Sequence, residues 1–152
     1  MVKSPAHSPK DPDYATRVRA SFARQRVMAW IGAELTHVAP GACEITLARK
    51  PEITQQHGYV HGGIIGTIGD TAAGYAGYTL MPRDASVLTV EYKMNIMAPG
   101  DGERLIARGE VIRAGRSLVV ARADVFAVKD GRETLCATLL QTLMTMHGKA
   151  DQ

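Results

Sequence analysis

A single carboxylate stands inside a long run of apolar and small residues in the middle of the chain. Between Gly62 and Met81 the only charged residue is Asp70, and His61-Gly62-Gly63 leads into the run. Burying a carboxylate among apolar groups is costly, so Asp70 is a candidate for chemistry. A Gly-Gly pair ahead of a helix leaves backbone N–H groups free to bind an anion or a polarised carbonyl. Together these features indicate an acyl-transfer site with a carboxylate base or nucleophile and an N–H oxyanion pocket.

Simpler interpretations of the same residues stay open. Asp70 is also compatible with a buried structural carboxylate bonded to hydroxyl groups, and Gly63 with a plain tight turn. His57, His61 and Asp70 are possible metal ligands, but their spacing matches no recognised metal site, so we expect no metal.

The composition is that of one globular domain. The chain has 152 residues, of which 45% are hydrophobic and 22% charged, with a net charge of +3. Its basic residues are scattered and aromatic residues make up only 5%, which argues against a nucleic-acid partner. The two cysteines, Cys43 and Cys136, lack metal-ligand spacing, and we expect them to be small buried residues. The polar N-terminal segment has no apolar signal core, so we expect a cytoplasmic protein.

Turn and helix-boundary signals predict an α+β fold. We expect a flexible tail over residues 1–12 and a single domain over 13–147. Asp11-Pro12 is typical of a helix start, which predicts a helix over 13–28 with Val18, Phe22 and Met28 facing the body and most arginines facing water. A second, longer helix spans 62–80 and ends before Pro82. The predicted strands are residues 33–39, 42–49, 86–97, 104–114, 116–128 and 133–146.

The long helix is expected to lie inside the fold. Six glycines, three threonines, two tyrosines and Asp70 lower its hydropathy, so a packed interior helix is favoured over a membrane span. Each glycine costs a helix about 1 kcal/mol relative to alanine, which requires a compensating reason. An antiparallel sheet of five to six strands curled closely around the helix supplies one, because small residues let the backbones approach.

Three strings of residues resemble the hotdog-fold thioesterases, in particular the phenylacetate-degradation (PaaI-like) acyl-CoA thioesterases. One is Gln55-Gln56-His57-Gly58-Tyr59-Val60-His61-Gly62-Gly63 with Asp70 nine positions after His61; the others are Thr89-Val90-Glu91-Tyr92-Lys93-Met94-Asn95 and Pro99-Gly100. The resemblance covers residues 30–146. It implies a hotdog fold and hydrolysis of an acyl- or aryl-acyl-CoA without a metal or redox cofactor.

The resemblance also implies the site residues. Asp70 is the general base that activates water or the nucleophile that forms an anhydride, and the Gly63 N–H, assisted by Gly62, binds the thioester oxygen. His61 orients the thioester or holds its loop. Gln55 stands where relatives often carry an Asn whose side chain positions a water or the leaving thiolate. Gln56 is the alternative candidate for this role.

Further positions follow the same resemblance, each with a plainer alternative. Thr89 aligns with a hydroxyl residue that holds the attacking water, although Thr is also ordinary in a strand. Arg113, Gly115 and Arg116 form a basic turn that suits the phosphates of CoA, or simply a solvated hairpin. Tyr75 lines the acyl pocket or packs in the core.

The resemblance implies a homodimer or a homotetramer built as a dimer of dimers, with active sites between subunits. Helical rise supports this independently, because nine residues span about 14 Å and Asp70 is therefore too far to serve the start of its own helix. The rival hypotheses are a non-catalytic acyl-CoA-binding regulatory module and a hydroxyacyl-CoA dehydratase. Asp70 favours the enzyme over the module, and the hydration motif of the dehydratases is not found.

Overall fold

The computed structural model describes residues 7–151. Part of the predicted tail, residues 1–6, lies outside them. The helices are α1 (Tyr14–Arg24), α2 (Arg26–Ile31), the 3-10 turn η1 (Pro51–Ile53) and α3 (Gly62–Tyr78). The strands are β1 (Ala33–Ala39), β2 (Ala42–Ala48), β3 (Ser86–Ile96), β4 (Arg104–Ala114), β5 (Leu118–Lys129) and β6 (Arg132–Met146).

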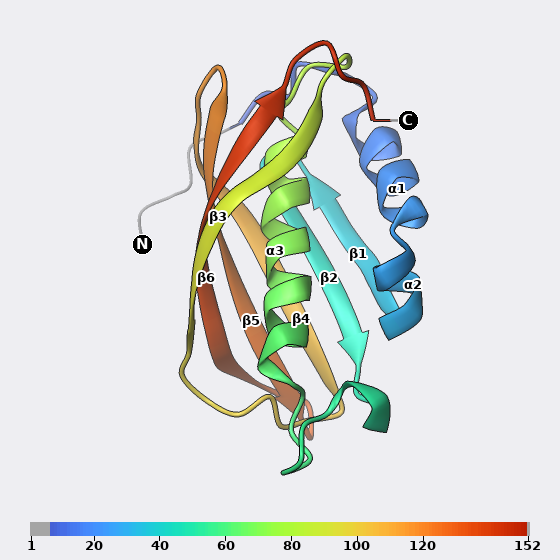
Figure 1. Ribbon diagram of the computed structural model, residues 1–152, viewed down its shortest axis with the longest axis vertical. Coiled ribbons are helices and arrows are strands. Elements are labelled where there is room, and N and C mark those ends of the chain that lie inside the picture. Colours follow the sequence, from blue (N-terminus) through green and yellow to red (C-terminus); the bar gives the residue numbers. More distant parts are fainter. Residues whose placement is uncertain (1–6, 152) are drawn as a thin grey trace.

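One antiparallel sheet wraps around the long helix α3 (Figure 1). Its strand order is β1-β2-β4-β5-β6-β3, so β1 and β3 are the two edges. α1 and α2 lie beside β1, and α3 lies against the concave face with its first residues at the end where η1 is found. This confirms the predicted α+β class and the hotdog arrangement, with six strands.

The predicted turns form as their residues require. Gly41 has φ +74° between β1 and β2, and Asp130 and Gly131 both have positive φ, at 50° and 74°, between β5 and β6. Two consecutive positive φ angles match the right-handed twist of the flanking strands, which is why an Asp-Gly pair favours this hairpin.

Small residues let α3 and the sheet approach each other closely. A Cβ on Gly109 of β4 would lie 2.3 Å from the Ala72 carbonyl oxygen of α3. On the helix side, a Cβ on Gly69 would meet Leu139 of β6 at 2.7 Å. The predicted reason for glycines in this helix is therefore confirmed at Gly69. No helix among residues 7–151 has the length and apolar character needed to span a bilayer.

The N-terminal helix is broken, which the sequence analysis did not predict. A single helix over 13–28 was expected, but Gln25 adopts an extended ψ of 100° and separates α1 from α2. An unbroken helix would place Met28 about 120° away from Phe22 around its axis. The break lets Val18 and Met28 both bury, while Phe22 packs against the core.

Arg17 of α1 caps the end of α3 instead of facing water as expected. Its guanidinium donates to the carbonyl oxygens of Tyr78 (3.3 Å), Met81 (2.8 Å) and Pro82 (2.8 Å), and it pairs with Asp11 at 3.2 Å. The last carbonyls of a helix lack partners within the helix, and a cation there also matches the helix dipole. Arg17 therefore ties α1 to the C-terminal end of α3. The other arginines of these helices, Arg19, Arg24 and Arg26, are exposed as predicted.

The described part of the predicted tail, residues 7–12, packs on the domain. Asp11 is only 2% exposed because Arg17 holds its carboxylate, and His7 Nε2 lies 3.1 Å from the Val111 carbonyl oxygen.

We predict that Arg17→Met lowers the free energy of unfolding by about 3 kcal/mol, because it leaves three carbonyl groups without their donor and the buried Asp11 carboxylate with only the exposed Arg83 as a cation partner. Denaturant unfolding at matched chain concentration measures the change. Arg122→Met is the control, since the Arg122–Asp124 pair lies on the surface and should contribute less than about 1 kcal/mol. Equal losses of stability in the two variants would show that Arg17 contributes no more than a surface ion pair does.

Candidate active site

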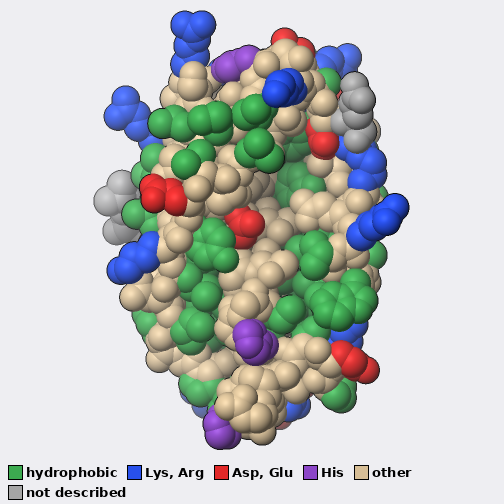
Figure 2. Space-filling model, viewed as in Figure 1, with side chains coloured by type: hydrophobic (Ala, Val, Ile, Leu, Met, Phe, Trp, Pro, Cys, Tyr) green, Lys and Arg blue, Asp and Glu red, His purple; other side chains and the backbone are tan. Residues whose placement is uncertain are grey.

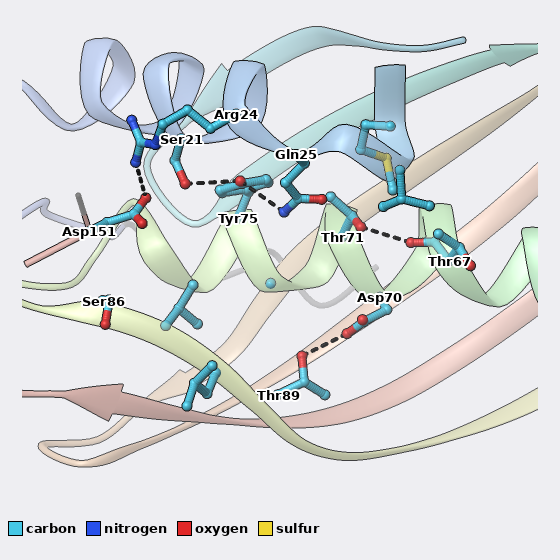
Figure 3. Close-up of a pocket in the computed structure, with 15 residues that line it drawn as sticks. Ser21, Arg24, Gln25, Thr67, Asp70, Thr71, Tyr75, Ser86, Thr89 and Asp151 are labelled. Carbon is cyan, nitrogen blue, oxygen red and sulfur yellow. Dashed lines mark hydrogen bonds and ion pairs between the residues drawn. The ribbon is translucent and has the colours of Figure 1, made fainter. Parts of the chain in front are cut away.

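Asp70 is held at mid-helix by two neutral donors from the sheet. The Thr89 hydroxyl of β3 donates to Asp70 Oδ1 at 2.7 Å, and Gln141 Nε2 of β6 donates to the same oxygen at 2.6 Å. Figure 3 shows the Asp70 and Thr89 side chains pointing toward each other from α3 and β3. Asp70 Oδ2 has no hydrogen bond or ion-pair partner among residues 7–151. One carboxylate oxygen is therefore anchored and the other is free to act.

Gln141 is a site residue that the sequence analysis missed. It is 1% exposed, and its amide also contacts Thr89 Oγ1 at 3.0 Å. The available signal was an amide between the apolar residues Leu139 and Leu143, in the inward-facing row of the strand. Strand alternation marks such a residue as buried and polar, but it does not reveal which group it contacts.

A cavity of about 550 Å³ lies beside Asp70. Its walls come from α1 and α2, from one face of α3, and from the start of β3. Figure 2 shows this face of the molecule hollowed along its centre, with hydrophobic side chains on both flanks. Gly74 forms part of the lining, and a Cβ added there would meet no atom within 4 Å. The cavity is large enough for an organic acyl group and opens at the candidate carboxylate.

Tyr75 borders this cavity but is itself 3% exposed. Its hydroxyl lies 3.0 Å from Ser21 Oγ and accepts a hydrogen bond from Gln25 Nε2 at 3.0 Å. Burial raises the pKa of the Tyr75 phenol, against the effect of these two hydrogen bonds, so it stays protonated. Tyr75 thus joins α3 to α1 and forms part of the cavity wall while packing in the core, and contact with an acyl group stays a prediction.

The start of α3 carries backbone N–H groups at the molecular surface. His61 is the N-cap, and its Nδ1 accepts the Gly63 N–H at 2.9 Å. The Gly62 N–H has no partner among residues 7–151. The predicted oxyanion donor, Gly63, is therefore exposed but already bonded to His61, which would have to turn away for Gly63 to bind a substrate oxygen.

Within one chain the backbone N–H groups of Gly62 and Gly63 lie far from the Asp70 carboxylate. Seven residues of helix separate Gly63 from Asp70, which corresponds to about 10 Å of rise. A single carbonyl group cannot contact both ends of that span. The structure of one chain therefore places both parts of the predicted site but does not bring them together.

The remaining predicted residues lie outside the cavity. Gln55 is in the loop before α3, where its side-chain oxygen accepts the His57 N–H and so stabilises the loop itself. Gly115 contacts Leu118 through its backbone, in the turn between β4 and β5. Arg113 and Arg116 are exposed in this turn, at the opposite end of the molecule from the start of α3 (Figure 1).

Cysteine chemistry is not available at the site. Burial raises the pKa of Cys43 to about 12 and that of Cys136 to about 11, so both thiols stay protonated and inert. Within the described residues, no three His, Cys, Asp or Glu side chains are grouped as metal ligands would be.

Comparisons with known proteins agree with this arrangement. The model of the thioesterase superfamily matches residues 57–134. A thioesterase family protein from Silicibacter pomeroyi is 47% identical, with a TM-score of 0.88 over 89% of this chain and 99% of that one. The PaaI protein from the phenylacetic acid degradation operon of Escherichia coli shares the fold at 16% identity, with a TM-score of 0.79 over 91% of this chain and 96% of that one. A thioesterase from Haemophilus influenzae, 18% identical, has a TM-score of 0.76 over 97% and 96% of the two chains.

Proposed function

The chain belongs to the thioesterase superfamily and is a thioester hydrolase, and from this premise we propose that it hydrolyses an acyl- or aryl-acyl-CoA to CoA and a carboxylic acid. The observation that carries the proposal is the Asp70 carboxylate, which is anchored through Oδ1 and free at Oδ2 on the wall of a cavity of about 550 Å³. An acyl group in that cavity would place its thioester carbonyl near the carboxylate.

Asp70 acts in one of two ways. As a general base it removes a proton from water while the water oxygen attacks the carbonyl carbon. As a nucleophile it attacks that carbon itself and forms an anhydride, which water then cleaves. In both routes the carbon–sulfur bond breaks and CoA leaves as a thiolate. Because a thiolate is a good leaving group, a base and an oxyanion pocket suffice.

The oxyanion pocket is assigned to the start of α3. The N–H groups of Gly63 and Gly62 point out of the first helical turn, where the helix dipole also favours negative charge. In the free chain the Gly63 N–H donates to His61 Nδ1, and the thioester oxygen replaces His61 as the acceptor when substrate binds. Gln55 orders the loop that carries these residues, and the water-holding role assigned to Thr89 becomes that of a donor to Asp70.

A second copy of the chain completes the site. β3 is an edge strand with exposed Leu88, Val90, Tyr92 and Ile96, and a long apolar edge is prone to pair with another strand. We assign this edge to a homodimer in which Asp70 of one chain faces Gly63 of the other, alone or within a homotetramer. Arg113 and Arg116 are assigned to the CoA phosphates, which their forked donors suit.

We predict that Asp70→Asn lowers kcat by about 10²-fold or more with little change in KM, because the amide neither accepts the proton nor attacks carbon. Thiol release with an aromatic thiol reagent measures the rate on phenylacetyl-CoA, benzoyl-CoA and a ladder of straight-chain esters. Cys43 and Cys136 are buried and protonated, so the protein adds little background. Near-normal turnover by Asp70→Asn would remove Asp70 from the mechanism. Wild-type binding of CoA esters without thiol release would favour the regulatory module.

Shared sites predict complementation between two inactive variants. Gly63→Val places a branched side chain over the exposed amide and should reduce activity about 10²-fold. After unfolding and refolding an equal mixture of Asp70→Asn and Gly63→Val, half of random dimers contain both chains, each with one intact site. The mixture should regain about a quarter of wild-type activity. Mixtures that stay as inactive as their components, with mixed dimers confirmed by mass spectrometry, would contradict a shared site.

Gly74 should set the size of the acyl group. Gly74→Val fills empty space in the cavity without meeting other atoms at its Cβ, and it removes a glycine from a helix, so the fold should persist. We expect kcat/KM for long and aryl esters to fall about tenfold or more while acetyl-CoA is hardly affected. Gly74→Ala is the matched control with a smaller effect. An equal loss on all esters would show that the acyl group lies elsewhere.

A further inference from the structure

We propose that Gln141 is a positioning residue that holds the Asp70 carboxylate through Oδ1 and thereby makes Oδ2 the reacting atom. This inference rests on the proposed function, because it assigns tasks within the same site. It concerns a residue that touches Asp70 and has no contact with the cavity.

The three side chains form a closed set of hydrogen bonds. Gln141 Nε2 lies 2.6 Å from Asp70 Oδ1 and 3.0 Å from Thr89 Oγ1, and the Thr89 hydroxyl donates to the same Oδ1 at 2.7 Å. Gln141 Nε2 also reaches the Asp70 carbonyl oxygen at 3.2 Å. Side chain and backbone of Asp70 are therefore both tied to β6, which restricts rotation of the carboxylate.

Gln141 fulfils this task at a cost to its own hydrogen bonding. It is 1% exposed, and its Oε1 is buried without a hydrogen-bond partner among the described residues. A buried unsatisfied acceptor destabilises a fold, whereas Leu139 and Leu143 on the same face of β6 carry no such group. Turning the amide over would place Oε1 against the carboxylate and the hydroxyl oxygen. The amide is thus locked with its donors toward Asp70.

The arrangement distinguishes the two carboxylate oxygens. Oδ1 accepts two hydrogen bonds, which fix its direction, while Oδ2 accepts none from residues 7–151. In the general-base route, Oδ2 takes the water proton as the hydroxyl oxygen bonds to the carbonyl carbon, and the proton then passes to the departing thiolate. In the nucleophilic route, Oδ2 forms the bond to that carbon and thiolate leaves.

The test is Gln141→Met, which keeps the side-chain length and removes both donors and the unsatisfied oxygen. We expect kcat to fall about tenfold or more with KM within about twofold, because a loosely held carboxylate is less often in position. Thr145→Val is the matched control, a buried polar residue on the same strand that does not contact Asp70, and neither quantity should change.

A second measurement needs no variant at position 141. In the wild-type protein the side-chain amide resonances of Gln141 should be displaced by the hydrogen bond to the Asp70 carboxylate, and in Asp70→Asn this displacement should be reduced. Amide resonances that are the same in the wild type and in Asp70→Asn would overturn the proposal even if Gln141→Met failed to fold.

The outcomes separate this inference from the proposed function. If Asp70→Asn is inactive but Gln141→Met keeps a normal kcat, only the role of Gln141 is wrong. If Asp70→Asn is fully active, the proposed function of the site fails first. A loss of kcat in Gln141→Met that is accompanied by a large rise in KM would indicate a merely structural residue and also overturn the proposal.

Discussion

The close approach of α3 to the concave face of the sheet is the constraint on which the rest of the structure depends. Gly109 of β4 has no room for a side chain against the Ala72 carbonyl, and Gly69 of α3 faces Leu139 in the same way. Because helix and sheet are so close, side chains from β3 and β6 reach a carboxylate in the middle of the helix. The glycines that weaken α3 as an isolated helix are thus what allows Asp70 to be held by Thr89 and Gln141.

The cavity depends on a second packing contact, made by α1 and α2. Arg17 anchors α1 to the last carbonyl of α3 and to two carbonyls that follow the helix, and Ser21 and Gln25 hold the Tyr75 hydroxyl. These polar contacts keep the two short helices against α3 while leaving open space above Gly74. Packing alone would tend to close that space, since interiors reach a uniform density. The wall is therefore held by directed hydrogen bonds in addition to the apolar packing of Val18, Phe22 and Met28.

Local signals in the sequence predicted the strands, the turns and the central helix, because alternation, Asp-Gly pairs and prolines act over a few residues. Asp70 was predicted because its charge is isolated in the sequence itself. The break at Gln25, the role of Arg17 and the contact of Gln141 with Asp70 were not, since each depends on a residue at least 50 positions away. The bond between Gly63 and His61 joins residues only two positions apart, and it was missed because the N–H that an N-cap side chain accepts depends on how the helix begins.

Helix geometry explains why the proposed site needs two chains. A helix rises by a fixed amount per residue, so the amides at the start of α3 and Asp70 stay about 10 Å apart however the side chains rotate. A bend in α3 that shortened this distance would pull Asp70 away from Thr89 and Gln141. An antiparallel pair of helices related by a two-fold axis resolves the conflict, because the start of each then faces the middle of the other. Thr89, which donates to the Asp70 carboxylate, belongs to the edge strand β3. The strand that anchors the carboxylate is therefore also the one available for that pairing.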